Sequence, residues 1–177
     1  QTSFRMFETG DNCIFYSLAA IKGVGEAAVE HIVAVRGDKP FASIEDFCLR
    51  IDPKQVNRRV FESLISAGAF DCFGRDRAEM IAGLDRIIGY AQRAQENKTS
   101  GQSDMFGSGA ATGPETITFP TFAPWLASEK MHREFQVLGF YLTAHPLDTY
   151  ASLLSKMRVQ SFADFSAAVK EGASAGR

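Results

Sequence analysis

The stretch IKGVGEAAVEHI, residues 21–32, decides the fold of this chain. Two glycines, Gly23 and Gly25, follow a short apolar segment and precede a run in which apolar residues recur at helical spacing. Glycine accepts sharp backbone turns that other residues adopt only with strain. The sequence therefore predicts a short helix, a tight turn and a second helix over residues 18–36.

The turn between these two helices has the chemistry of a phosphate site. Its backbone amides, and those in the first turn of the following helix, lack intrahelical partners and are expected to point outward. The dipole of the helix at 26–36 adds positive potential at the same place, and a lysine side chain adds a charge. The predicted phosphate contacts are Lys22, Gly23, Val24 and Gly25. The alternative is an ordinary helix end followed by a new helix.

The apolar residues around the turn have the spacing of the helix-hairpin-helix motif, which this stretch closely resembles. They are Ile21, Val24, Ala28 and Ile32. Ser43 is the predicted N-cap of a following helix, and Asp52 is the predicted N-cap of another that begins at Pro53. A glycine-containing break at 68–74 then precedes a further helix, so residues 18–95 are predicted to hold two helix-turn-helix pairs in tandem. Helix-hairpin-helix units commonly act in pairs that hold a duplex by its backbone without reading bases.

A cluster of cations surrounds the start of the second helix pair. Lys54 and Arg58 lie one turn apart in the predicted helix, on the side away from its apolar stripe. Asn57 adds a neutral donor. The predicted phosphate contacts of this region are Lys54, Asn57, Arg58, Arg59 and Arg75. The alternative is a solvated helix face that binds nothing.

The remaining segments are predicted to flank this helical domain. The strand-like runs FRMFE and CIFYSL surround the turn TGDN, which predicts a β-hairpin within residues 1–17. Residues 96–124 are rich in Gly, Ser and Thr and predict a flexible linker. Residues 125–177 predict further helices, the first of which docks on the core through Trp125, Met131, Phe135 and Leu138. The expected fold class is mainly α, with a small N-terminal β-hairpin and additional C-terminal helices.

Composition restricts the function further. The net charge of the 177-residue chain is -2, so any binding of nucleic acid must be local. Three widely spaced cysteines suggest reduced thiols and no metal site, and no apolar run is long enough to span a membrane. No catalytic motif is present, and His31 is expected to be exposed to solvent. The chain begins without Met and stops in mid-loop, which suggests a fragment of a longer protein.

Four blocks of the sequence, in order, resemble the C-family of bacterial replicative DNA polymerases, the family of the DNA polymerase III alpha subunits. The blocks are AIKGVGEAAVEHIVAVR, NRRVFESLISAGAFDCFG, GQSDMFG and LGFYLTAHPLDTY. The resemblance implies that residues 1–17 join a preceding fingers region, that 18–95 form a tandem helix-hairpin-helix domain on duplex DNA, and that 125–177 lead to an OB-fold. It places the catalytic palm and its Mg²⁺ outside this chain, so the parent is expected to polymerise DNA and this fragment only to bind.

The resemblance also assigns a partner to the linker. In this family the stretch after the helix-hairpin-helix domain carries a peptide of the form Q-x-D/S-hydrophobic-F that binds the sliding clamp. QSDMF matches that pattern at Gln102, Asp104, Met105 and Phe106. An exposed peptide with two adjacent apolar side chains suits a partner's groove. The alternative is that Met105 and Phe106 pack on this domain's own surface.

The expected partners are therefore duplex DNA, the beta sliding clamp and, through the parent protein, other replicase subunits in the cytoplasm. Two other functions stay open. One is a helical protein-interaction scaffold whose glycine turns are only structural and which does not bind DNA. The other is a role in an error-prone paralogue of the same polymerase family, which the intact clamp peptide disfavours.

Overall fold

The computed structural model describes residues 7–10, 13–100, 116–157 and 159–175. It divides into two compact units, Gln1–Leu142 and Thr143–Arg177, which we call the N-terminal and C-terminal units. The fold is mainly helical, as the sequence predicts.

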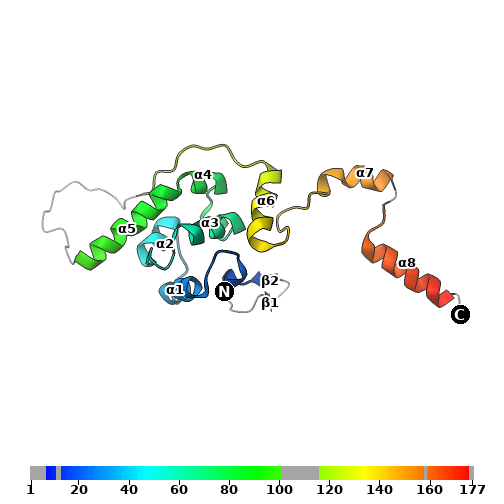
Figure 1. Ribbon diagram of the computed structural model, residues 1–177, viewed down its shortest axis with the longest axis horizontal. Coiled ribbons are helices and arrows are strands. Elements are labelled where there is room, and N and C mark those ends of the chain that lie inside the picture. Colours follow the sequence, from blue (N-terminus) through cyan, green and yellow to red (C-terminus); the bar gives the residue numbers. More distant parts are fainter. Residues whose placement is uncertain (1–6, 11–12, 101–115, 158, 176–177) are drawn as a thin grey trace. The chain divides into compact units, whose positions relative to one another are not determined.

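The N-terminal unit begins with a two-stranded sheet, which leads into a series of packed helices (Figure 1). Strands β1 (Phe7–Gly10) and β2 (Cys13–Tyr16) pair antiparallel, with Phe7 opposite Tyr16 and Gly10 opposite Cys13. The helices that follow are η1 (Leu18–Ala20), α1 (Glu26–Arg36), α2 (Ile44–Arg50), α3 (Arg58–Ala67), η2 (Asp71–Phe73), α4 (Arg77–Ala82), α5 (Leu84–Ser100) and α6 (Ala127–Leu138). The C-terminal unit contains η3 (Asp148–Tyr150), α7 (Ala151–Lys156) and α8 (Phe162–Ala175).

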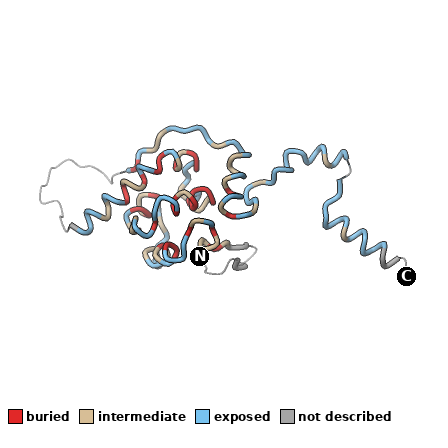
Figure 2. The backbone as a smooth tube through the Cα atoms, in the orientation of Figure 1, coloured by how far each residue is buried: buried red, intermediate tan, exposed pale blue. Residues whose placement is uncertain are grey.

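One hydrophobic core joins the helices of the N-terminal unit, and Figure 2 shows buried residues along α1 to α5. All four apolar residues of the predicted motif, Ile21, Val24, Ala28 and Ile32, are buried. Phe47 packs edge-on against Phe61 and Phe70, with ring centroids 5.8 Å and 5.0 Å apart. In the C-terminal unit the apolar residues of α8 that have described side chains, such as Phe162 and Phe165, are exposed.

The start of α3 differs from the prediction. The helix begins at Arg58, not at Pro53, and its N-cap is Asn57, whose side chain accepts from the Val60 amide at 3.2 Å. Asp52 caps a separate turn, because its carboxylate accepts from the Lys54 amide at 2.9 Å. Val56, at the end of this turn, is buried in the core.

The predicted linker at 96–124 is also too long. Helix α5 continues to Ser100, and a segment at 116–120 lies on the core. Ile117 is buried and its amide donates to Glu45 Oε1 at 3.2 Å. The Phe119 ring lies against Gly83, where a Cβ would come within 2.8 Å of it. The single helix predicted after the break at 68–74 is divided at Gly83 into α4 and α5.

The predicted exposure of His31 and the predicted docking of the helix after residue 125 through Phe135 are wrong. His31 is half-buried and its Nε2 accepts from the Asp52 amide at 2.7 Å, which ties α1 to the turn before α3. Helix α6 does not dock through Phe135, which is 43% exposed. It docks through Leu138 and through Glu134, which is completely buried against Arg77.

Candidate nucleic-acid interface

The turn before α1 requires glycine at position 23. Gly23 has a φ of 88°, in the left-handed region that side-chain-bearing residues rarely adopt. A Cβ added there would lie 2.6 Å from Ser63 Oγ and 3.3 Å from Arg59 Nε, both on α3. The Gly23 turn between η1 and α1 therefore packs directly against the first two turns of α3.

The amides of this turn are only partly available, which corrects the expectation that they all point outward. Val24 is buried, and its amide donates to the Ile21 carbonyl at 3.1 Å. The Lys22 amide donates to the Val137 carbonyl at 2.9 Å, although the Lys22 side chain is exposed. Within the described residues, the amides of Gly25, Glu26 and Ala27 have no protein acceptor, and Gly25 caps α1 without a side chain. These three amides form the usable N-terminus of α1.

The predicted contacts from two parts of the sequence meet in one groove of about 490 Å³ between α1 and α3. We call it the α1–α3 groove. Its walls include Gly23, Val24, Gly25, Asn57 and Arg59. The N-termini of α1 and α3 both border it, so both helix dipoles add positive potential there. Among the described residues, no carboxylate pairs with the exposed Arg59. The groove therefore has the donors and the charge that a phosphate needs.

Arg58, next to Arg59, is engaged by two carboxylates. Its Nε donates to Glu62 Oε1 at 3.1 Å, and its Nη1 pairs with Asp85 at the start of α5. The hydrogen bond to Asp85, followed by the charge of Asp85 and the contact with Glu62, raises the pKa of Arg58 above its usual value. The charge of Arg58 is thus already balanced in the unbound protein.

The other predicted cations do not join the groove. Lys54 is exposed in the turn before α3 and lines a separate hollow with Gln92 and Gln95 of α5. The prediction that Lys54 and Arg58 lie one helical turn apart is wrong, because α3 begins only at Arg58. Arg75 is exposed and its guanidinium lies 4.6 Å from the centre of the Phe119 ring.

Two further arginines from the cationic regions have structural contacts. Arg50 donates through Nε and Nη2 to the Val35 carbonyl and through Nη2 to that of Arg36, so it caps the end of α1. Arg77 is buried and donates to both oxygens of Asp71 and to Glu134 Oε1. Burial alone would lower the pKa of Arg77, but its hydrogen bonds to Asp71 and Glu134 outweigh that effect and raise it.

The Arg77–Glu134 pair and the exposed arginines of α5 could not be predicted from the sequence, because no local pattern marks a helical Glu as buried or an Arg as part of a groove.

The predicted clamp contacts, Gln102, Asp104, Met105 and Phe106, lie outside the described residues. In the described ranges, no three His, Cys, Asp or Glu side chains gather closely enough to bind a metal ion. No helix there combines the length and the apolar character that crossing a bilayer demands.

Comparison with known proteins finds a matching family model and similar proteins. A family model described as "Helix-hairpin-helix motif" matches residues 1–80. "DNA polymerase III subunit alpha" of Caulobacter vibrioides is 37% identical over 172 residues, which are 97% of this chain and 15% of the relative. The protein of the same name from Vibrio cholerae is 40% identical over 154 residues, covering 85% of this chain and 13% of the relative. The protein of the same name from Escherichia coli K12 is 39% identical over 143 residues, which are 79% of this chain and 12% of the relative. These matches confirm the resemblance that the four sequence blocks predict.

Proposed function

We propose that this chain, which is homologous to a segment of the bacterial DNA polymerase III alpha subunit, holds duplex DNA by its phosphate backbone and attaches its parent polymerase to a sliding clamp. The chain spans about 15% of the length of the Caulobacter relative, so the activity of the whole protein is part of this proposal. The parent would be a cytoplasmic DNA-directed DNA polymerase whose palm, Mg²⁺ and partner subunits act outside the 177 residues.

The observation that supports DNA binding is the α1–α3 groove. Two helix N-termini, the unpaired amides of Gly25 to Ala27 and the exposed Arg59 border one open surface. Amides and a few cations bind phosphates without contacting base edges, which gives affinity but no sequence preference. Lys22 and Asn57 extend this contact on either side of the turn.

The clamp attachment is supported by the sequence and the homology alone. Gln102 would anchor the peptide by hydrogen bonds, Asp104 would flank it, and Met105 and Phe106 would fill apolar pockets of the clamp. A peptide that becomes ordered on binding gives modest affinity, but a second contact on the same chain raises the effective concentration of both. The combination would keep the enzyme on its template. In this arrangement residues 18–95 bind DNA, and 125–177 lead toward an OB-fold.

The DNA proposal is tested by measuring the fluorescence anisotropy of two labelled duplexes of equal length and unrelated sequence. We expect equal affinities that fall steeply as salt rises. A protein-interaction scaffold predicts no salt-dependent binding to either duplex. A strong preference for one sequence would also contradict backbone recognition.

The clamp proposal is tested separately with a bacterial beta clamp immobilised on a biosensor. Met105→Ala combined with Phe106→Ala should abolish binding, because both apolar anchors are removed. Ser108→Ala combined with Thr112→Ala, outside the matched pattern, is the control. Unchanged clamp affinity in the first variant would refute this half of the proposal without affecting the DNA half.

A further inference from the structure

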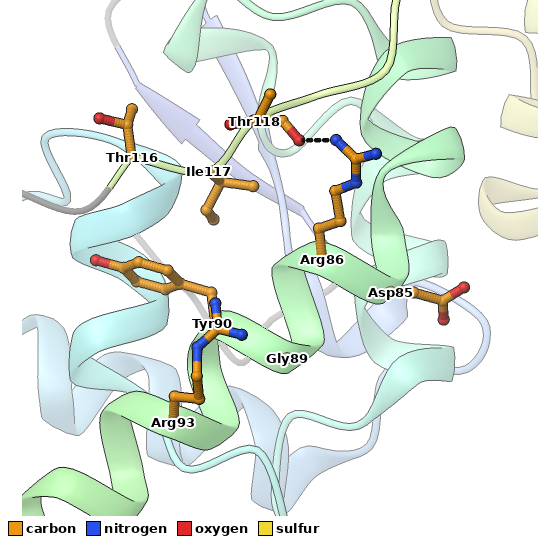
Figure 3. Close-up of a pocket in the computed structure, with 8 residues that line it drawn as sticks. All are labelled: Asp85, Arg86, Gly89, Tyr90, Arg93, Thr116, Ile117 and Thr118. Carbon is orange, nitrogen blue, oxygen red and sulfur yellow. Dashed lines mark hydrogen bonds between the residues drawn. The ribbon is translucent and has the colours of Figure 1, made fainter.

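A second polar groove lies between α5 and the extended segment at 116–118, with a volume of about 480 Å³ (Figure 3). We call it the α5 groove. Arg86, Gly89 and Arg93 line it from the helix, and Thr116 and Thr118 line it from the segment. None of these residues belongs to the phosphate contacts predicted from the sequence.

Two arginines on one face of α5 give this groove its charge. Arg86 and Arg93 are seven residues apart, which is close to two helical turns and places their Cα atoms about 10 Å apart on the same side. That is about three base-pair steps along a duplex axis. Gly89 lies between them, and a Cβ added there would meet nothing within 4 Å. The space between the two cations is therefore open.

The Arg86 guanidinium is oriented by a neutral partner. Its Nη1 donates to the Thr118 carbonyl at 2.7 Å, which Figure 3 marks with a dashed line. A carbonyl fixes the side chain without cancelling its charge, and a guanidinium has further N–H groups to donate. Arg86 is thus held in place with donors left for an anion.

An ion pair connects α3, which borders the α1–α3 groove, to the start of α5. Asp85 lines the α5 groove and pairs with Arg58, the residue beside Arg59 in the chain. We propose that the α5 groove binds phosphates of the same duplex that occupies the α1–α3 groove. This inference rests on the proposed function and extends the interface from two helix N-termini onto the side of α5.

The lining favours a phosphodiester backbone over an acidic peptide. Peptide grooves usually offer apolar pockets for anchoring side chains. Here the apolar residues of the lining, Tyr90 and Ile117, are 7% and 5% exposed and belong to the core. The accessible lining is arginine, threonine and backbone, which are groups that contact phosphates in protein–DNA complexes, together with Asp85, whose carboxylate is paired with Arg58.

The test uses the 177-residue chain and a labelled duplex, with affinity measured against salt. Arg93→Gln should weaken binding several-fold and reduce the slope of log K against log salt by about one, as expected for one lost phosphate contact. Lys39→Gln, which removes the same charge at the opposite end of α1 from Gly25, should leave the slope unchanged. Gly89→Glu should weaken binding much more than Gly89→Gln, because only the former places a carboxylate between the two arginines.

The outcomes separate this inference from the proposed function. If Arg59→Gln reduces the salt slope but Arg93→Gln and Gly89→Glu do not, the α5 groove proposal is overturned and the α1–α3 groove stands. If the wild-type chain shows no salt-dependent duplex binding, both are overturned. Equal effects of Gly89→Glu and Gly89→Gln would also contradict a phosphate between Arg86 and Arg93.

Discussion

Gly23 in the first hairpin and Arg59 in α3 lie in contact, so closely that a Cβ on Gly23 would approach Arg59 Nε to 3.3 Å. This contact joins the two halves of the α1–α3 groove. The left-handed backbone at Gly23 turns the chain toward α1 and at the same time leaves room for the Arg59 and Ser63 side chains. The geometry of the proposed interface therefore depends on a residue that has no side chain.

Gly23→Ala should destabilise the protein by about 1–3 kcal/mol, because alanine is strained at a positive φ and its Cβ would collide with Ser63. Urea denaturation followed by circular dichroism gives the free energy of unfolding. Gly25→Ala is the matched control, since Gly25 has a φ of -77° and open space around it. Equal stability of the two variants would show that the turn tolerates a side chain at position 23.

Asp85→Asn should strengthen duplex binding about two- to fivefold, because it releases Arg58 from an exposed, solvent-screened ion pair and leaves its charge available for a phosphate. In an Arg58→Gln background the same substitution should give a smaller gain. Glu96→Gln on α5 removes an equal charge away from this pair and serves as the control. Identical gains in both backgrounds would mean that Arg58 does not mediate the effect.

Glu134→Ala should destabilise the protein by about 2–4 kcal/mol, because it leaves the buried Arg77 with Asp71 as its remaining carboxylate partner. Glu129→Ala on the same helix removes a half-exposed pair with Arg133 and should cost no more than about 1 kcal/mol. Thermal unfolding compares the two variants. Similar losses of stability in the two variants would show that the buried Arg77–Glu134 pair stabilises the protein no more than the Glu129–Arg133 pair does.

Cys48 should make stability fall at alkaline pH. Burial, followed by the charge of Glu45, raises the pKa of its thiol from 9.0 to about 12. Between these values the unfolded chain loses the proton and the folded protein keeps it, so the free energy of unfolding decreases by ~1.4 kcal/mol per pH unit. Unfolding of Cys48→Ala measured from pH 8 to 10.5 should therefore show a flatter profile than the wild type. Parallel profiles would contradict a protonated thiol at position 48.

Local signals in the sequence identified the first hairpin well. The spacing of Ile21, Val24, Ala28 and Ile32 predicted a helix-hairpin-helix motif, and all four residues are buried in the core. Ser43 was predicted as an N-cap, and its side chain does accept from the Asp46 amide at 3.2 Å. These features depend on residues a few positions apart, which is the range over which sequence patterns are informative.

Features that depend on contacts between residues far apart in the chain could not be predicted from the sequence. Asp52 and Asn57 are both good N-caps, but Asp52 caps a separate turn and only Asn57 caps α3. Glu134 looks like a surface residue until Arg77, 57 positions away, is placed beside it. Asn57 and Arg59 likewise come to line one groove with the Gly23 turn only when that turn packs against α3.

The central claim is that the α1–α3 groove binds the phosphate backbone, and the salt dependence of duplex binding by Arg59→Gln tests it most directly. The account predicts that this variant lowers the slope of log K against log salt by about one, equally for two unrelated duplex sequences. Lys39→Gln, with the same net charge, should keep the wild-type slope. A wild-type slope in Arg59→Gln would contradict the claim.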